Sequence, residues 1–302
     1  MVVVKTYLKK LPGLHRLLAE RDQFRRDLLQ RTRERDALWK HRSFDPELVP
    51  NQQLIRASGV LTLEGWYRWA EEWSMLLRVY GMMRTSSKVL EIGCGLGRVG
   101  FAIRHILDPR RGAYYGFDIA TDKIEFAQNT LGKKYPNYHF TVANLNNTFY
   151  NPGDAPRPTE YRFPYQAAAM DVTFAASVFT HMLPDATGHY FRETARVLKP
   201  GGRAVFSFFL FDHYVPGRHR PGTFSAAIFN FDHARPEYGD DFALADPANP
   251  EMMTAYRLAF VKRMAADAGL VFEESLPGMW SGAFDRWLAM QDIVVLRKPE
   301  SA

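Results

Sequence analysis

One short stretch, Lys88–Arg98, joins an apolar run directly to a cluster of glycines, and few folds can use that combination. The apolar residues of 89–92 are typical of a strand that is buried on both faces of a parallel sheet. Three glycines, spaced two apart and ending at Gly97, follow at once. Glycine permits the positive φ angles of a tight turn and lets a ligand approach the backbone closely. Apolar residues then recur at helical spacing over 99–106, so the N-terminal amides of the predicted helix face the same ligand.

Two kinds of binding site have this pattern. Gly95–Gly100 fits the G-x-G-x-x-G fingerprint of dinucleotide-binding folds, and an acid follows at Asp118. Glu91–Gly97 fits the pattern E-x-G-x-G-x-G equally well, and this pattern resembles the loop of class I S-adenosylmethionine-dependent methyltransferases. In a third interpretation the glycines only connect a strand to a helix. The rest of the chain has to distinguish between these three interpretations of the glycine motif.

The composition indicates a globular protein of the cytoplasm. The chain has 302 residues, 46% of them apolar, which is enough for one large α/β domain plus an appendage. Its single cysteine, Cys94, excludes an internal disulfide and is expected to be a small filler in the glycine loop. No apolar run reaches the length of a membrane span, and residues 1–5 do not resemble a signal peptide. We therefore expect a cytoplasmic location.

The positive charge is concentrated at the N-terminus. Residues 1–43 contain twelve Lys and Arg against five Asp and Glu, a net charge of +7, whereas the whole chain carries +6, which leaves −1 for the remainder. A nearly neutral main domain argues against a catalytic domain that grips nucleic acid over a broad basic face. Residues 14–40 are predicted to form a basic helical arm with a short coiled-coil pattern. This arm is a solvated helix, a surface for self-association or a protein partner, or a peripheral contact with the inner face of a membrane. Residues 44–59 are predicted to be a linker.

Beyond the linker, predicted strands and helices alternate, which indicates a doubly wound, mostly parallel sheet. The predicted strands are 88–92, 113–118, 138–142, 171–176, 204–210, 270–275 and 292–296, and the predicted helices are 63–80, 98–106, 121–131, 184–198 and 251–268. Residues 144–165 are expected to form a long loop. Residues 212–250 interrupt the alternation and are predicted to be an insertion on the substrate side. No strong helix separates the last two strands, so they are expected to be antiparallel neighbours.

The aromatic stripe on the helix predicted at 63–80 allows two interpretations. It contains Trp66, Trp69 and Trp73 at helical spacing. Such a stripe is most often part of the core, and here it also has the position to cover the mouth of a ligand site.

Several motifs together make the resemblance specific. The closing antiparallel strands are similar to the seven-stranded plan of class I methyltransferases, in which the antiparallel last strand pairs beside the fifth. Leu198–Gly202 resembles the turn before their fifth strand, and Ser177–Met182 resembles the fourth-strand region of the small-molecule type 11 and type 12 subgroup. The similarity covers residues 60–298. It implies a Rossmann-like α/β fold and S-adenosylmethionine as cofactor.

The resemblance also implies which residues hold the cofactor. Glu91 and the loop of Gly93, Cys94, Gly95 and Gly97 would surround the methionine part, and the carboxylate of Glu91 can meet its ammonium. Asp118 would accept both ribose hydroxyls, and Ile119 would cover the adenine. Many members have an Asp for the adenine amino group where this chain offers Asn144. Leu145, beside it, and Ser177, after the fourth strand, complete the expected cofactor site.

Transfer of a methyl group to a hydroxyl requires a base, because the hydroxyl proton must leave. His181 follows the predicted fourth strand and is the first candidate, with packing or helix capping as the alternative role. His213 and Tyr214, after the fifth strand, are further candidates. No His, Cys or Asp residues have metal-ligand spacing, so no metal site is predicted. The fourth strand is not followed by an Asp/Asn-Pro-Pro-Tyr/Phe motif, which weighs against adenine methylation in nucleic acid.

The sequence thus predicts a methyltransferase that acts on a small-molecule or glycan acceptor. A sugar hydroxyl in cell-surface polysaccharide synthesis is one such acceptor, by analogy with basic arms on glycan enzymes. The alternatives are an NAD-dependent oxidoreductase and a non-catalytic scaffold that acts through the arm.

Overall fold

The computed structural model describes residues 45–147, 153, 155–214, 231 and 233–300. The chain divides into two units, Met1–Val49 and Pro50–Ala302. Within the first unit the described residues contain one short 3-10 helix, η1 (Pro46–Leu48). The predicted basic helix at 14–40 lies outside the described residues, and so do the coiled coil, self-association and membrane contact expected of it.

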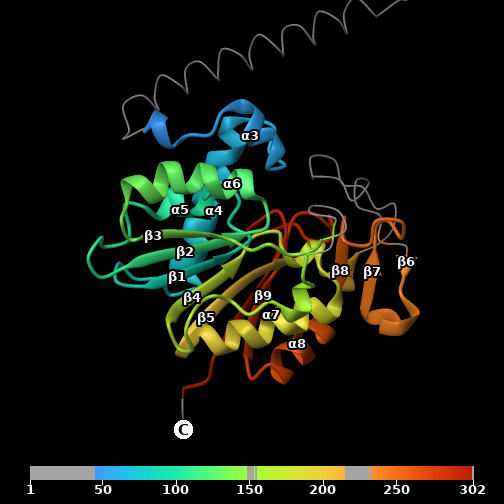
Figure 1. The fold of residues 1–302 in the computed structure, drawn as a ribbon. Coiled ribbons are helices and arrows are strands. Elements are labelled where there is room, and N and C mark those ends of the chain that lie inside the picture. The colour runs from blue at the N-terminus through green and yellow to red at the C-terminus, as the bar shows by residue number, and fades with distance from the viewer. Residues whose placement is uncertain (1–44, 148–152, 154, 215–230, 232, 301–302) are drawn as a thin grey trace, which may run out of the picture. The chain divides into compact units, whose positions relative to one another are not determined.

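The second unit is built on a seven-stranded sheet (Figure 1). Its strands are β1 (Lys88–Ile92), β2 (Ala113–Asp118), β3 (Tyr138–Val142), β4 (Met170–Ala175), β5 (Leu198–Phe208), β9 (Val271–Leu276) and β10 (Asp292–Arg297). The order across the sheet is β3-β2-β1-β4-β5-β10-β9. The first five strands in this order pair in parallel, and β10 is antiparallel to both β5 and β9. The predicted doubly wound sheet with an antiparallel last strand is confirmed.

Helices cover both faces of this sheet. In Figure 1, α4 (Leu63–Val79), α5 (Arg98–Ile103) and α6 (Thr121–Ala127) lie on one side, and α7 (Pro184–Val197) and α8 (Leu258–Asp267) lie on the other. A π-helical turn, η2 (Gln128–Gly132), continues α6. The largest fully buried side chains are aromatic, among them Phe174, Phe206 and Phe208 of the central strands. Burial on both faces explains why the central strands are apolar almost throughout.

The insertion between β5 and α8 contains a second, smaller sheet. After the 3-10 helix η5 (Phe211–His213), its described part consists of β6 (His233–Ala234), η7 (Pro236–Asp241), β7 (Phe242–Leu244) and β8 (Thr254–Tyr256). The three strands are antiparallel in the order β6-β7-β8. The predicted helix at 251–268 is therefore wrong over its first turns, because β8 precedes α8. Thr254 and Tyr256 are buried and favour a strand, and the ring of Tyr256 packs against Phe242 at 5.0 Å.

The segment Leu198–Gly202, expected to be a turn before the fifth strand, is part of β5. Met170 of β4 pairs with Leu198, whereas Val172 pairs with Arg203. The extra residues of β5 form a bulge, in which Gly201 has a φ of 77°. The turn-forming residues thus bend the strand rather than precede it.

The predicted linker at 44–59 also differs from the structure. Residues Gln52–Ala57 form helix α3, which belongs to the second unit. The side chain of Asn51 caps this helix by accepting a hydrogen bond from the amide of Leu54. Ile55, on the same helix, is buried. The prolines of this segment come before the helix, so they do not prevent it.

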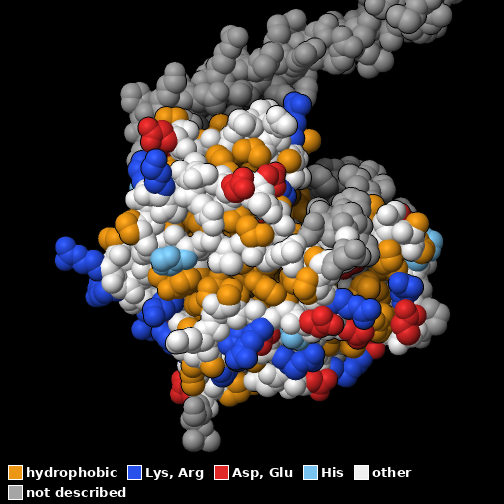
Figure 2. All heavy atoms as spheres, in the orientation of Figure 1, with side chains coloured by type: hydrophobic (Ala, Val, Ile, Leu, Met, Phe, Trp, Pro, Cys, Tyr) orange, Lys and Arg blue, Asp and Glu red, His pale blue; other side chains and the backbone are white. Residues whose placement is uncertain are grey.

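Two further expectations concern loops and surfaces. In the region 144–165, the only helix or strand that the described residues contain is the short 3-10 helix η3 (Pro158–Glu160), as the loop prediction requires. Among the described residues, no helix combines the length and the apolar content needed to cross a membrane. Figure 2 shows basic and acidic side chains intermixed over α7 and α8 on the face that it presents. Arg263 of α8 forms an ion pair with Asp241 of η7.

Candidate active site

A cavity of about 870 Å³ opens at the carboxyl ends of β1, β2, β4 and β5. This is the edge at which open α/β sheets bind their ligands. The walls are the glycine loop, the end of β2, the segment after β3, the end of β4 and residues 56–59 at the C-terminal end of α3. Trp66 and Trp69 of α4 also line it, and Trp66 is at the same time completely buried in the core. Both interpretations of the aromatic stripe therefore apply.

The glycine loop forms an open cradle at one side of this cavity. The amides of Gly93 and Cys94 both donate to the carbonyl of Phe117, at 2.8 and 3.0 Å, which fixes the loop to the end of β2. Gly93 has a φ of 71°, and a Cβ atom there would come within 2.4 Å of the Cγ2 atom of Val178. Gly95 has a φ of 51°, and a Cβ atom there would meet nothing closer than 4.0 Å. The backbone is thus bare where it faces the cavity, and a ligand can lie directly on it.

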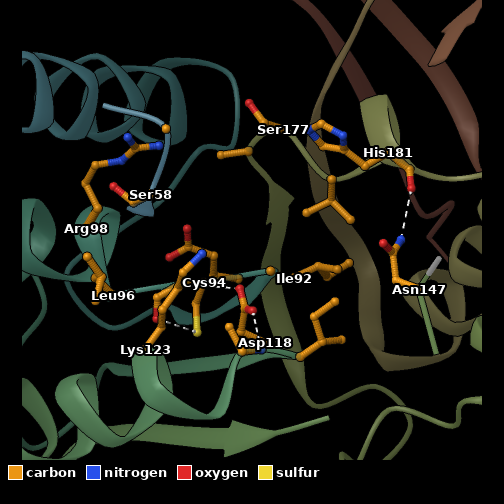
Figure 3. A pocket seen from close by; sticks show the side chains of 18 of the residues that line it. Ser58, Ile92, Cys94, Leu96, Arg98, Asp118, Lys123, Asn147, Ser177 and His181 are labelled. Carbon is orange, nitrogen blue, oxygen red and sulfur yellow. Dashed lines mark hydrogen bonds between the residues drawn. The ribbon is translucent and has the colours of Figure 1, made fainter. Parts of the chain in front are cut away.

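Asp118, at the end of β2, connects this loop to the next one. Its Oδ2 atom accepts a hydrogen bond from the amide of Gly95 at 2.7 Å, and its Oδ1 atom accepts from the amide of Ala120 at 2.9 Å. Figure 3 shows Asp118 beside the glycine loop. Each carboxylate oxygen has a second lone pair, so a held Asp118 can still accept from two adjacent hydroxyls. A ribose presents two adjacent hydroxyls of this kind.

Glu91 lies at the end of β1, beneath the loop. Its side chain is only 3% exposed and accepts a hydrogen bond from the hydroxyl of Tyr114. Burial raises the pKa of Glu91 to about 8, although the Tyr114 hydrogen bond and the charge of Arg98 both act in the opposite direction. A buried carboxyl of this kind favours a cationic ligand, because a nearby positive charge restores the ionised form.

Arg98, the first residue of α5, supplies the complementary charge. Its guanidinium carbon lies 5.0 Å from the ring centre of Trp69, and its buried Nη1 atom has no hydrogen-bond partner. Burial lowers the pKa of Arg98, which the nearby carboxyls of Glu91 and Glu72 partly offset. An orphaned buried guanidinium N–H on a cavity wall fits a carboxylate. Together, Glu91 and Arg98 match the ammonium and the carboxylate of an amino acid, so the residues fit the methionine part of S-adenosylmethionine.

Most of the predicted site residues line the cavity together. These are Glu91, Gly93, Cys94, Gly95, Asp118, Ile119, Leu145, Ser177 and His181. Cys94 is buried, and burial raises the pKa of its thiol well above the usual value, so it is an inert filler. Arg98 was missed, although it directly follows the last glycine of the motif.

Two of the residues predicted to hold the cofactor, Gly97 and Asn144, lie outside the cavity lining. Gly97 caps α5 with a φ of 73°, and a Cβ atom there would approach Leu131 at 3.0 Å, so it serves packing and not the ligand. Asn144 is exposed, because its neighbours Ala143 and Leu145 are buried and turn it outward. Asn146 and Asn147 line the cavity in its place. The expected contact between Asn144 and adenine therefore has no support in the geometry.

His213 and Tyr214 also lie outside the cavity lining. The ring of His213 is exposed and meets the ring of Phe284 edge-on at 5.1 Å. Tyr214 stacks on Trp280, with ring centres 5.6 Å apart. Both side chains therefore pack against the insertion and the loop before β10, and neither is placed to act as the base.

His181 and Ser177 lie at the end of the cavity away from Arg98 (Figure 3). The Nδ1 atom of His181 is 2.7 Å from the carbonyl of Met252 and donates to it in the neutral ring. Burial lowers the pKa of His181, and the carbonyls of Met252 and Glu251 partly offset this effect. Ser177 has a φ of 60°, which is rare for a residue other than glycine. Its hydroxyl donates to Gln291 at 2.9 Å, and its amide donates to the hydroxyl of Ser207 at 2.8 Å.

In the described part of the chain, no group of three or more His, Cys, Asp or Glu side chains is arranged to hold a metal ion.

Comparison with known families identifies the domain. The family model of a type 12 methyltransferase domain matches residues 90–204, from the middle of β1 to the middle of β5. Over this segment the chain is similar to class I methyltransferases. S-adenosylmethionine is the cofactor that this domain implies, and the Glu91, Arg98 and Asp118 side chains fit it.

Individual relatives of this methyltransferase domain are distant. The O-methyltransferase cnsE of Penicillium expansum is 27% identical over 130 residues, which are 42% of this chain and 40% of that protein. The chain thus matches well under half the length of this relative. The PH0226 protein of Pyrococcus horikoshii OT3 has a similar fold, with a TM-score of 0.53 and 17% identity over 78% of this chain and 92% of that one. The [4+2]-cyclase SpnF has a TM-score of 0.51 and 14% identity over 79% of this chain and 84% of that one. Since one such structure is a cyclase, the fold alone does not determine the reaction.

Proposed function

We propose that the protein transfers the methyl group of S-adenosylmethionine to a hydroxyl of a small-molecule acceptor. The observation that carries this proposal is the placement of a buried acid and a buried cation on one glycine cradle. Glu91 and Arg98 are suited to the two charged groups of an amino acid, and Asp118 lies at the end of the neighbouring strand, where a ribose would follow. An NAD site needs no ammonium partner at this point. The antiparallel β10 and the family match also favour methyl transfer over the oxidoreductase alternative.

The bound cofactor would supply a methyl group on a positively charged sulfur, which is ready for in-line displacement. The protein's part is then to position both reactants and to exclude water. Glu91, Arg98 and Asp118 would hold the cofactor at three points, while the bare backbone at Gly95 allows it to lie close. Trp66 and Trp69 would cover the site from α4.

Oxygen is the favoured methyl acceptor because a histidine lies on the acceptor side. The hydrogen bond from Nδ1 to Met252 leaves the basic lone pair of the neutral ring on Nε2. His181 would take the hydroxyl proton at that atom. The relative from Penicillium expansum is an O-methyltransferase, which supports the same choice. A sugar hydroxyl, a phenol and an alkyl alcohol all belong to this acceptor class.

Titration calorimetry with S-adenosylhomocysteine and with NAD tests the cofactor. We expect the first ligand to bind and the second not to bind. Asp118→Ala should weaken S-adenosylhomocysteine by roughly 1.5–3 kcal/mol, the scale of hydrogen bonds to a charged group. Asp267→Ala, which removes an exposed carboxylate at the end of α8, is the matched control and should change nothing. Binding of NAD without binding of S-adenosylhomocysteine would refute the proposal.

A further inference from the structure

The sheet order divides the cavity into two halves. The residues suited to the cofactor belong to β1 and β2 and to the loops that follow them. On the other side of β1, the lining continues over the ends of β4 and β5 and the start of β10. This second half, the acceptor half, is where a second substrate can lie next to the cofactor.

Apolar and sulfur-containing side chains dominate the acceptor half. Met182, Met253 and Met290 line it together with Phe209. Methionine is unbranched and polarizable, and its sulfur makes favourable contacts with aromatic rings. A wall of three methionines and one phenylalanine therefore suits a flat aromatic body.

The polar side chains of this half are few and are already engaged. Among the described residues they are Ser177, His181, Gln291 and Asn147, whose side-chain amide donates to the carbonyl of His181 at 3.5 Å. Ser177 donates to Gln291, and His181 donates to the carbonyl of Met252. Among the described lining residues, the charged ones belong to the cofactor half or to the segment around α3, where Arg56 is exposed at the rim. A sugar would bring several hydroxyls into this half, and buried hydroxyls without partners are costly.

The wall of the acceptor half is held rigidly. The hydroxyl of Tyr256 donates to the carbonyl of Met182 at 2.6 Å, and the hydroxyl of Thr254 donates to the carbonyl of Phe179 at 3.0 Å. Behind the wall, Phe209 packs against Trp280 at 4.9 Å. Met253 and Met290 pack against the same cluster. A preformed apolar slot of this kind selects its ligand by shape.

We infer that the acceptor is a planar aromatic molecule with a phenolic hydroxyl, held between the methionines of the acceptor half; this rests on the proposed methyl transfer. In the reaction, the phenolic oxygen bonds to the methyl carbon while the carbon–sulfur bond breaks and its electron pair stays on the sulfur. The phenolic proton passes to His181. A phenol has a pKa of about 10. An alkyl hydroxyl holds its proton about as tightly as water, and therefore much more tightly than a phenol does. A buried histidine with a lowered pKa is a weak base, so it matches the phenol better.

The test measures binding and methylation with matched probes. Protein saturated with S-adenosylhomocysteine is titrated with 2-naphthol and with methyl α-glucoside, and methylation of each probe in the presence of S-adenosylmethionine is followed by mass spectrometry. We expect 2-naphthol to bind and to be methylated, and the glucoside to do neither. Met253→Glu places a carboxylate against the ring and should raise the Kd of 2-naphthol by at least about tenfold, since burial of a charge beside an apolar group is unfavourable. Met75→Glu, on the exposed part of α4, is the matched control.

The affinity for S-adenosylhomocysteine separates the possible failures. If this ligand does not bind, the proposed function is wrong. If it binds and the glucoside is preferred, or if neither probe binds, the inference of a phenolic acceptor is wrong. A Met253→Glu protein that binds S-adenosylhomocysteine normally and 2-naphthol unchanged would also overturn it.

Discussion

Glu91 shows how a single buried carboxyl on a cavity wall can lower the stability of the protein that contains it. The pKa of Glu91 is raised from 4.5 to about 8 because the side chain is buried. Between these two values the folded protein keeps a proton that the unfolded chain has released. The free energy of unfolding contributed by this group therefore falls as the pH rises through that window. Below pH 8 the cavity thus holds a largely protonated carboxyl, and a cation bound beside it would favour the ionised form.

Glu91→Gln should raise the free energy of unfolding of the free protein and at the same time weaken its binding of S-adenosylhomocysteine. The amide keeps an acceptor for Tyr114 and cannot ionise, so the free protein should gain roughly 1–3 kcal/mol at pH 8 and little at pH 5. Affinity for S-adenosylhomocysteine should fall at least about tenfold, because a charged partner of the ammonium is lost. Calorimetric unfolding at both pH values and titration at pH 8 check this. Glu125→Gln, an exposed carboxyl on α6, is the control. Equal stability of variant and wild type at pH 8 would show that Glu91 is not held protonated.

A second residue-scale prediction concerns His181 as the base. General base catalysis supplies about 10²–10⁴ in rate, so His181→Ala should lower kcat by that factor while affinity for S-adenosylhomocysteine stays within about twofold. His181→Asn should be no better, because an amide cannot take the proton. In the wild type, kcat should fall with decreasing pH below the usual histidine value of 6.5, because burial lowers the pKa and the protonated ring cannot act as a base.

The exposed His139, stacked on Tyr115, provides the matched control variant His139→Ala. Retention of more than about a tenth of the activity by His181→Ala would assign this histidine to packing. Its function would then be to hold the carbonyl of Met252 against the segment after β4.

At the residue scale, most residues of the motif line the cavity, whereas several residues predicted around it do not. Gly93, Gly95 and Asp118 were recognisable because their chemistry depends on backbone shape and on the end of a strand. Asn144 lies outside the cavity lining because the burial of its two neighbours, which sets its direction, depends on packing against distant segments. His213 and Tyr214 follow a strand at the expected edge of the sheet, but their rings pack against Phe284 and Trp280 of the loop before β10. A motif therefore predicts the loop, whereas tertiary packing determines the direction of single side chains.

At the element scale, helix α3 changes the expected boundary of the catalytic unit. Residues 56–59, the last two residues of this helix and the two that follow it, line the cavity. A protein that lacks residues 1–43 keeps them, so its affinity for S-adenosylhomocysteine should stay within about twofold of the wild type, since the described cavity-lining residues all lie after residue 55. Ser58→Trp, which fills the cavity from this segment, should weaken binding in the same assay. A large loss of affinity on removal of 1–43 would mean that the basic arm contributes to the site.

The elements that the sequence missed share a physical cause. Alternating helices and strands were predictable because each buries a regular apolar face. Strand β8 was taken for helix because three residues are too few to show a period, and its pairing with β7 decides the conformation. The bulge in β5 was taken for a turn because its glycines and proline favour both. Short elements depend on partners that are distant in sequence.

At the scale of the whole molecule, ligand binding and unfolding are coupled. A ligand that binds only the folded state at 100 times its Kd adds about 2.7 kcal/mol to the free energy of unfolding. For a unit of this size, each kcal/mol raises Tm by about 2–4 °C, so S-adenosylhomocysteine at that concentration should raise Tm by about 5–11 °C. Differential scanning calorimetry measures the shift, and NAD at the same concentration should produce none. An equal shift with NAD would indicate a general nucleotide site.

The two halves of the cavity come largely from different stretches of the chain, so the two halves can change independently in evolution. The cradle and its acids come from β1, β2 and their loops, within the segment that the methyltransferase family matches. Three parts of the acceptor wall, Phe209, Met253 and Met290, lie after the end of that match at residue 204. Substitution or exchange of the later stretch would alter which molecule is methylated and leave the donor chemistry untouched. The protein is thus built so that selectivity can diverge while the reaction is inherited unchanged.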